Sequence, residues 1–161
     1  MYVLEIQKQR DLMQQLLMGS TFHEWQLREA AVTTYAAFHV DGTLQKEYYD
    51  KEALEELQGR ECALWKEVQP YCFSLIKGQR TPLSFLFVFQ PSVLVRQAFL
   101  QYSGLDSEAL ESFHFSLNCR FASGKMMITS GTSADTFTMD RTAEHAWDAY
   151  VEKYLMAKGI E

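Results

Sequence analysis

The sequence has little of what would place it in a membrane or among secreted, disulfide-bonded proteins. Its longest apolar stretch, residues 83–89, is interrupted by Ser84 and is far too short to span a bilayer. The first residues lack the basic segment and the apolar run of a signal peptide. The three cysteines, Cys62, Cys72 and Cys119, lie among apolar residues, which favours reduced thiols over a disulfide framework. We therefore expect a cytoplasmic protein with no membrane partner.

Positive charge is also scarce. Fifteen Lys and Arg residues against 21 Asp and Glu give a net charge of −6, so the chain as a whole repels phosphate backbones and nucleic-acid binding is unlikely. Proline is rare, whereas 47% of the residues are hydrophobic and 14% are aromatic, which indicates a packed core rather than disorder. A length of 161 residues fits a single domain over residues 1–161.

Catalytic and metal-binding motifs are absent as well. No spacing of histidines and cysteines matches a zinc site. His114 lies beside Ser116 on the polar face of a predicted strand, but the sequence places no acid that would orient the imidazole. The other histidines are His23, His39 and His145. We predict no catalytic residue, no metal and no cofactor, and the sequence favours a non-enzymatic protein over an enzyme.

What is present is a faint internal duplication at a spacing of 82 residues. Leu12, Gly42 and Trp65 recur as Leu94, Gly124 and Trp147. Strict identities are few, and the signal lies in the order of element types. Two halves, about 1–78 and 83–161, are each predicted to contain a strand, a helix, a meander of strands and a final helix.

The expected elements follow from periodicity and turn residues. In the first half these are strand 1–6, helix 9–18, strand 26–40, a hairpin turn at Asp41-Gly42, strand 43–49, helix 51–58 capped by Asp50, and helix 62–76. Pro70 is expected to kink or split this last helix, because proline removes a helical donor. In the second half they are a central buried strand 83–89, a helix from Pro91 or Ser92 to Tyr102, strand 113–121, a turn at Ser123-Gly124, strand 125–129, loop 131–134, strand 136–139, and a helix from Asp140 or Thr142 to Ala157.

Hairpins with segregated helices make the predicted fold α+β, with an antiparallel sheet or sheets and helices packed on one side. By topology alone this is similar to the sliding-clamp domain of replication factors and to the saddle of the TATA-binding protein. Both of those act on DNA, but a likeness of fold does not carry a function.

Several stretches taken together resemble a known family. They are Asp41-Gly42 after a Phe-rich strand, Trp65-Lys66-Glu67-Val68-Gln69-Pro70, Leu75-Ile76-Lys77-Gly78-Gln79-Arg80-Thr81-Pro82-Leu83-Ser84-Phe85, Ser130-Gly131-Thr132-Ser133 and Ala146-Trp147-Asp148. The chain resembles, over most of its length, a small domain-of-unknown-function family from clostridia and related gut bacteria. The resemblance implies a cytoplasmic bacterial protein and assigns no active residue.

The strongest candidate ligand site is the junction between the two halves, residues 77–82. Lys77, Arg80 and Thr81 supply two cations and a hydroxyl on a loop, a combination that can hold a phosphate or another anion. The alternative is a polar linker in which Lys77 interacts with the dipole of the preceding helix.

Three weaker candidates each have a structural alternative. Residues 130–133 form a small-residue loop for an anion, or a plain connection. Glu144, Asp148 and Glu152 form a carboxylate cluster for a divalent cation, or a solvated helix face. Trp65 and Trp147 form a ligand stack, or part of the core.

Three functions remain open. The first is a non-enzymatic interaction or oligomerisation domain that binds a protein partner or forms homo-oligomers through a sheet edge or an exposed aromatic face. The second is an anion- or nucleotide-binding domain that uses residues 77–82. The third is a clamp-like nucleic-acid-associated protein, for which Lys8, Arg10 and Arg96 offer only a thin basic surface.

Overall fold

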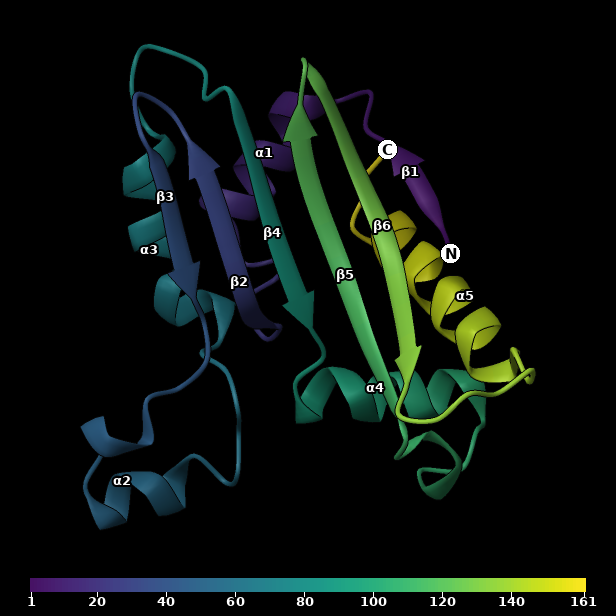
Figure 1. Cartoon of the computed structure of the whole chain (residues 1–161). Helices are drawn as coiled ribbons and strands as arrows, with labels where there is room; N and C mark the ends of the chain where they lie inside the picture. Colours follow the sequence, from purple (N-terminus) through teal and green to yellow (C-terminus); the bar gives the residue numbers. More distant parts are fainter.

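Six antiparallel strands form one sheet in the order β1-β6-β5-β4-β2-β3 in the computed structural model, which describes all 161 residues (Figure 1). The strands are β1 (Val3–Glu5), β2 (Gln26–Thr33), β3 (Ala37–Asp41), β4 (Ser84–Gln90), β5 (Phe113–Ala122) and β6 (Lys125–Ala134). The helices are α1 (Gln9–Leu17), α2 (Lys51–Glu56), α3 (Trp65–Ile76), α4 (Val93–Ser103) and α5 (Thr142–Ala157), with short 3-10 turns at Lys46–Tyr48 and Glu108–Leu110. No helix is both long enough and apolar enough to cross a bilayer.

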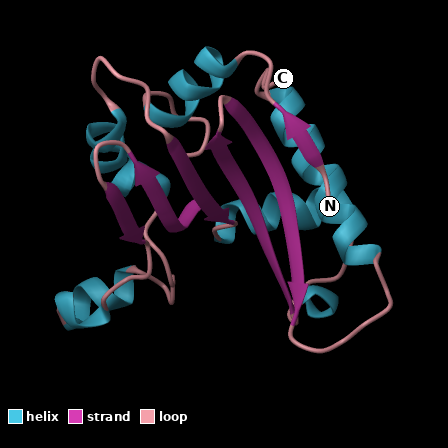
Figure 2. Ribbon diagram, turned by 45° about the horizontal axis from the view of Figure 1, so that its top comes forward, coloured by secondary structure: helices cyan, strands magenta, loops and turns pink.

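Helices α1, α3, α4 and α5 lie on one face of the sheet and leave the other face open, whereas α2 projects away from the sheet and has no buried residue (Figure 1; Figure 2). Burial alternates along the central strands as it must when one face meets the core: Phe85, Phe87 and Phe89 of β4 are buried, whereas Leu86 and Val88 between them are partly exposed. This confirms the α+β prediction with helices on one side. It also corrects one detail, because the predicted buried strand at 83–89 is central in the sheet but covered on a single face.

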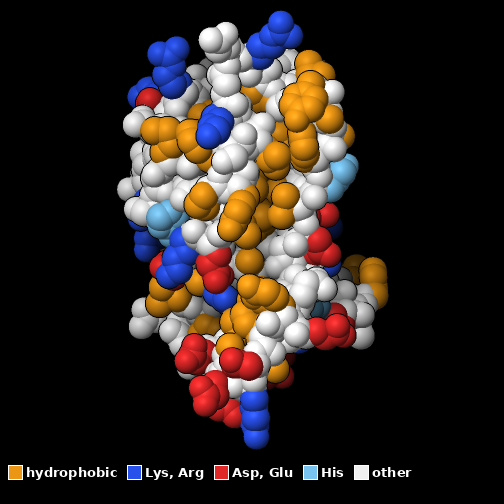
Figure 3. Space-filling model, turned by 90° about the vertical axis from the view of Figure 1, so that its left-hand side faces the viewer, with side chains coloured by type: hydrophobic (Ala, Val, Ile, Leu, Met, Phe, Trp, Pro, Cys, Tyr) orange, Lys and Arg blue, Asp and Glu red, His pale blue; other side chains and the backbone are white.

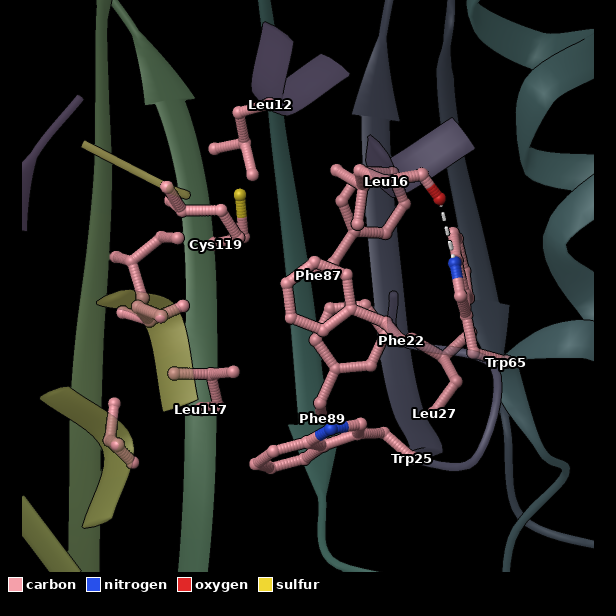
Figure 4. Packing of buried hydrophobic residues seen from close by; sticks show 14 of the residues in the cluster. Leu12, Leu16, Phe22, Trp25, Leu27, Trp65, Phe87, Phe89, Leu117 and Cys119 are labelled. Atoms are coloured by element: carbon pink, nitrogen blue, oxygen red, sulfur yellow. Dashed lines mark hydrogen bonds between the residues drawn. The ribbon is translucent and has the colours of Figure 1, made fainter. Parts of the chain in front are cut away.

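Large aromatic side chains fill the space between the sheet and the helices. Trp65 lies against Phe87 and Phe89, and its Nε1 donates to the carbonyl of Leu16, 2.8 Å away (Figure 4). Trp147 in α5 is equally buried, and its Nε1 donates to the carbonyl of Ser116 at 2.9 Å. Both tryptophans therefore belong to the core, as the structural alternative predicted.

Local signals at helix ends and turns are confirmed. The Asp50 carboxylate accepts from the N–H of Ala53 at 2.8 Å, and the Ser92 hydroxyl accepts from the N–H of Val95 at 3.3 Å, so both residues cap their helices. Ser123 and Gly124 have φ angles of 53° and 76°, the conformation of a tight hairpin turn between β5 and β6.

The predicted strand 26–40 is wrong, because the chain turns back within it. β2 ends at Thr33, and the N–H of Thr34 donates to the carbonyl of Ala36 to close a hairpin into β3. Tyr35 at the tip is 93% exposed. Thr34 and Tyr35 in the turn favour strands and no Gly, Pro, Asn or Asp marks it, so composition did not reveal it. The predicted partner strand 43–49 is wrong too, since that segment forms one isolated bridge and a 3-10 turn.

The Asp41-Gly42 pair marks a close backbone approach instead of a hairpin turn. A Cβ on Gly42 would lie 1.7 Å from the carbonyl oxygen of Leu27, beside the irregularity in β2 between Leu27 and Glu29. Only glycine, which has no Cβ, fits where these two backbone segments lie so close together.

The predicted loop 131–134 and strand 136–139 are also wrong. β6 continues through Ala134, because Gly131 pairs with Ser116 and Ser133 pairs with His114 on β5. A Cβ on Gly131 would meet the Ser116 Oγ at 2.3 Å, so this glycine serves close strand packing. Residues 136–139 form no strand, and Phe137 in that segment is 92% exposed. Residues 130–133 are thus not an anion-binding loop.

The late helix of the first half begins later than predicted. α3 starts at Trp65, and Cys62 instead forms a bridge with Thr43. Pro70 lies inside α3, which runs unbroken to Ile76.

The two halves share their element order but not every strand position. Each contains a strand, a helix, a hairpin and a late helix, and Trp65 and Trp147 lie in the two late helices. β4 pairs with β5 of its own half, whereas β1 pairs with β6 of the other half. Duplication, and the clamp-like or TATA-binding-protein-like topology, stay predictions.

One buried polar side chain ties α3 to the end of α1. The Gln69 Nε2 donates to the carbonyls of Leu16 and Gly19, both at 2.9 Å, and its Oε1 lies 2.8 Å from the His23 Nε2. Gln69 is only 8% exposed. A polar residue in an otherwise apolar helix face therefore fixes how two helices meet.

Replacing Gln69 with methionine keeps the volume but removes the side-chain donor to the Gly19 carbonyl, one of the two side-chain donors to the Leu16 carbonyl and the contact with His23, while the Trp65 Nε1 still donates to Leu16. We expect Gln69→Met to lower the free energy of unfolding by about 2–3 kcal/mol. Urea denaturation measures this. The same change at exposed Gln101 on α4 is the control, with an expected effect within about 0.5 kcal/mol. Equal effects at the two positions would contradict the structural role of Gln69.

Candidate functional site

The outer edge of β3 is unpaired. β3 is the last strand of the sheet and pairs only with β2. The N–H of Gly42 donates to the carbonyl of Arg28 on β2, so every second residue counted back from Gly42 also faces β2. The backbone N–H and C=O groups of the remaining β3 residues point outward: Ala37, His39 and Asp41. Such a row is a template for another strand.

A pocket of about 580 Å³ lies at one end of this edge and contains the predicted ligand residues. Lys77, Arg80 and Thr81 line it together with Phe38 of β3 and the exposed Leu83. Neither cation forms an ion pair within the chain. The structure thus brings Lys77, Arg80 and Thr81 together around one pocket, part of whose lining is apolar.

An apolar strip runs beneath the edge, between β3 and α3. Phe38 and Val40 lie on the helix-facing side of β3, and Leu75 of α3 lines the same pocket as Phe38. Val68 and Tyr71 share the flank of α3 that carries Leu75, because the three residues recur at helical spacing. Its five members, Phe38, Val40, Val68, Tyr71 and Leu75, are all at least partly exposed, and Tyr71 is 71% exposed. We call these residues the β3–α3 strip. Figure 3 shows hydrophobic side chains on this side of the molecule.

Basic and acidic side chains gather at opposite ends of this same side of the molecule. Lys and Arg side chains gather at its upper end, and Asp and Glu dominate the lower end near α2 (Figure 3). Lys77 and Arg80 belong to the upper end. The segment that follows β3 and the helix α2 supply exposed acids: Glu47, Asp50, Glu52, Glu55 and Glu56. The β3 edge is therefore basic at one end and acidic at the other.

A second cleft, of about 600 Å³, lies between the α2–α3 connection and the start of α4. Its two guanidinium groups are already occupied, since Arg60 pairs with Glu67 at 3.0 Å and Arg96 donates to the carbonyl of Leu110 at 2.9 Å. Three carboxylates, of Glu24, Glu56 and Glu61, also line the cleft. The balance of charge in this cleft disfavours an anion.

His114, at the rim of that cleft, has an acid partner that the sequence did not place. Its Nε2 lies 2.7 Å from the Asp135 Oδ1. The hairpin register could have revealed this contact, because His114 pairs with Ser133 and Asp135 follows two residues later. Both side chains are more than half exposed, and no hydroxyl or thiol is hydrogen-bonded to the imidazole. The pair lacks the nucleophile and the enclosure of a catalytic site.

The carboxylates predicted on the last helix contact protein groups. Glu144 and Asp148 lie 3.3 and 3.0 Å from the N-terminal amine, and these contacts, led by that to Asp148, raise the pKa of the amine. Asp148 also accepts from the Ser130 hydroxyl at 2.5 Å. Glu152 is not part of this cluster, and no group of three His, Cys, Asp or Glu side chains has a metal-binding arrangement.

The three cysteines are free thiols in buried positions. Burial raises the pKa of Cys72 to about 11 and that of Cys119 to about 12. Burial also raises the pKa of Cys62. None of them is a thiolate near neutral pH, so none is activated as a nucleophile.

Comparison with known proteins agrees with the resemblance to a family of unknown function. No curated protein and no solved structure matches this chain. A family model described as "Family of unknown function (DUF5721)" matches residues 15–161. The match spans most of the chain, and the protein therefore belongs to the DUF5721 family.

Proposed function

We propose that this protein is a non-enzymatic interaction domain that binds a polypeptide segment as an added strand along the outer edge of β3. The cytoplasmic, bacterial setting that the family resemblance implies is part of the same proposal. Strand addition uses backbone hydrogen bonds for affinity and side-chain pockets for specificity.

The unpaired edge of β3 carries this proposal. A free edge with exposed apolar side chains is usually blunted by charge, proline or a covering segment, because it invites pairing. Here the β3–α3 strip follows the edge and the pocket with Lys77, Arg80 and Thr81 closes one end of it. An added segment would bury its alternate apolar side chains on the strip and place a carboxylate beside Lys77 and Arg80. The anion-binding role predicted for these residues becomes one part of peptide recognition.

Selection from a display library of random peptides tests the proposal. We expect the selected peptides to share alternating apolar residues with an acidic residue or a C-terminal carboxylate at one end. Arg80→Glu should weaken their binding by about tenfold, the size of one exposed charge-assisted contact with its sign reversed. Lys125→Glu, at the exposed β5–β6 turn, is the matched control and should leave binding unchanged.

Amide hydrogen exchange then locates the bound peptide. The N–H groups of Ala37, His39 and Asp41 should become protected when a selected peptide binds. Failure of the monomeric chain to select any shared pattern, or protection confined to another element, would overturn the proposal.

A further inference from the structure

We infer that the segment which occupies the β3 edge is β3 of a second copy of this chain, so that two sheets join into one across a two-fold axis. This inference rests on the proposed use of the edge and names its partner.

The backbone of β3 is suited to antiparallel pairing with itself. Its outward residues, Ala37, His39 and Asp41, are evenly spaced about His39. With the axis at His39, the two His39 residues exchange a pair of N–H to C=O hydrogen bonds. Ala37 of each copy does the same with Asp41 of the other copy. Every outward backbone group of β3 is then satisfied without a shift of register.

The β3–α3 strip meets its own equivalent in this arrangement. A two-fold axis perpendicular to the sheet leaves both sets of helices on the same side, so the exposed flanks of the two α3 helices come together behind the joined strands. Tyr71, at 71% exposure, lies on that flank and would be covered by the second copy. The interface thus gains an apolar layer in addition to the hydrogen bonds.

The charges along the edge also complement one another. Antiparallel pairing reverses the second copy, so the basic end with Lys77 and Arg80 meets the acidic end that follows β3 in the other copy (Figure 3). Glu47 and Asp50 belong to that acidic end. Because the contact is isologous, the same complementarity occurs twice and the assembly closes at two copies.

An unrelated peptide satisfies only some of these features. It could pair with β3 and contact Lys77, but it would leave the exposed flank of α3 and the acidic segment after β3 without partners. A second copy covers the edge, the strip and both charged ends at once. No free β3 edge remains in the dimer.

Sedimentation equilibrium of the full chain across a range of concentrations tests the inference. The expected mass is twice the 18.7 kDa of one chain. His39→Pro removes an outward N–H and no bond to β2, and it should raise the dissociation constant of the dimer by roughly 100-fold. His39→Ala keeps the N–H and is the matched control, with a dissociation constant close to that of the wild type.

A second variant, Tyr71→Glu, keeps the inference testable if His39→Pro does not fold. Tyr71→Glu changes an exposed residue outside the core, so the variant should have the circular dichroism spectrum of the wild type. At concentrations low enough for both proteins to be monomeric, the two should also have the same melting temperature. Tyr71→Glu should also give monomers where the wild type gives dimers. High salt should weaken the wild-type dimer, because the charged ends are exposed.

Two outcomes would overturn the inference. The first is a wild-type chain that stays monomeric at hundreds of micromolar. The second is a dimer that folded His39→Pro and Tyr71→Glu leave intact. If the chain is monomeric and still selects peptides that protect β3, only the identity of the partner is wrong. If neither dimer nor peptide uses β3, the proposed function fails as well.

Discussion

Replacing Trp147 with alanine is expected to lower the free energy of unfolding by about 4–5 kcal/mol, near the upper end for a single core substitution. The indole is fully buried and lies within 5.0–5.9 Å, between ring centroids, of four other aromatic rings. These rings belong to Trp25, Phe99, Phe115 and Tyr150. Its removal leaves a cavity where α4, α5 and the sheet meet. Thermal denaturation should show a fall in Tm of roughly 10–15 °C.

Trp147→Phe separates packing from hydrogen bonding. Phenylalanine keeps most of the aromatic contacts but cannot donate to the carbonyl of Ser116. We expect it to cost about 2 kcal/mol, the sum of a smaller side chain and a buried acceptor without its donor. If Trp147→Ala were no more destabilising than Trp147→Phe, Trp147 would not be the centre of this cluster.

Gly42→Ala is expected to cost about 3–4 kcal/mol, although it adds a single methyl group, because the new atom would overlap the backbone of β2. The Cβ would stand 1.7 Å from the carbonyl oxygen of Leu27 and 2.7 Å from its carbonyl carbon. Neither atom belongs to a flexible side chain, so β2 and the segment after β3 must separate. Urea denaturation of the purified variant gives the change in the free energy of unfolding.

Gly104→Ala is the matched control at a different kind of glycine. Gly104 ends α4 with a φ of 70°, and a Cβ there would meet no atom within 4 Å. The only cost is the left-handed backbone conformation, about 1–2 kcal/mol. If Gly42→Ala lowered the free energy of unfolding no more than Gly104→Ala does, the backbones at Gly42 and Leu27 would not be in close contact.

The parts of the fold that the sequence predicted are those set by local chemistry. The alternation from Phe113 to Phe121 predicted β5, the Ser123-Gly124 pair predicted its turn, and Asp50 predicted a helix cap. The errors arose where a tertiary contact decided the structure. Thr34 and Tyr35 favour strands but form a turn, because β3 must return along β2. Gly42 looked like a turn glycine, and only its distance to Leu27 reveals its role.

The candidate site was predictable in composition but not in geometry. The unusual grouping of Lys77, Arg80 and Thr81 was visible in the sequence, and the structure places all three around one pocket. Phe38 and Tyr71 could not be assigned to the same surface. The predicted strand 26–40 hid the edge that Phe38 occupies. Only the structure places α3 against β2 and puts Leu75, on the flank of α3 that also carries Tyr71, into the same pocket as Phe38.

The pairing of β1 with β6 has a consequence for the order of folding. β5 and β6 are joined by a two-residue turn, so their hairpin closes a short loop. Val3 pairs with Thr129, a residue far away along the chain, so this contact closes a long loop. β1 has only three residues to offset that loss of chain entropy. β1 is therefore expected to be the last strand to join the sheet, and it should be the first to detach when the native state opens locally.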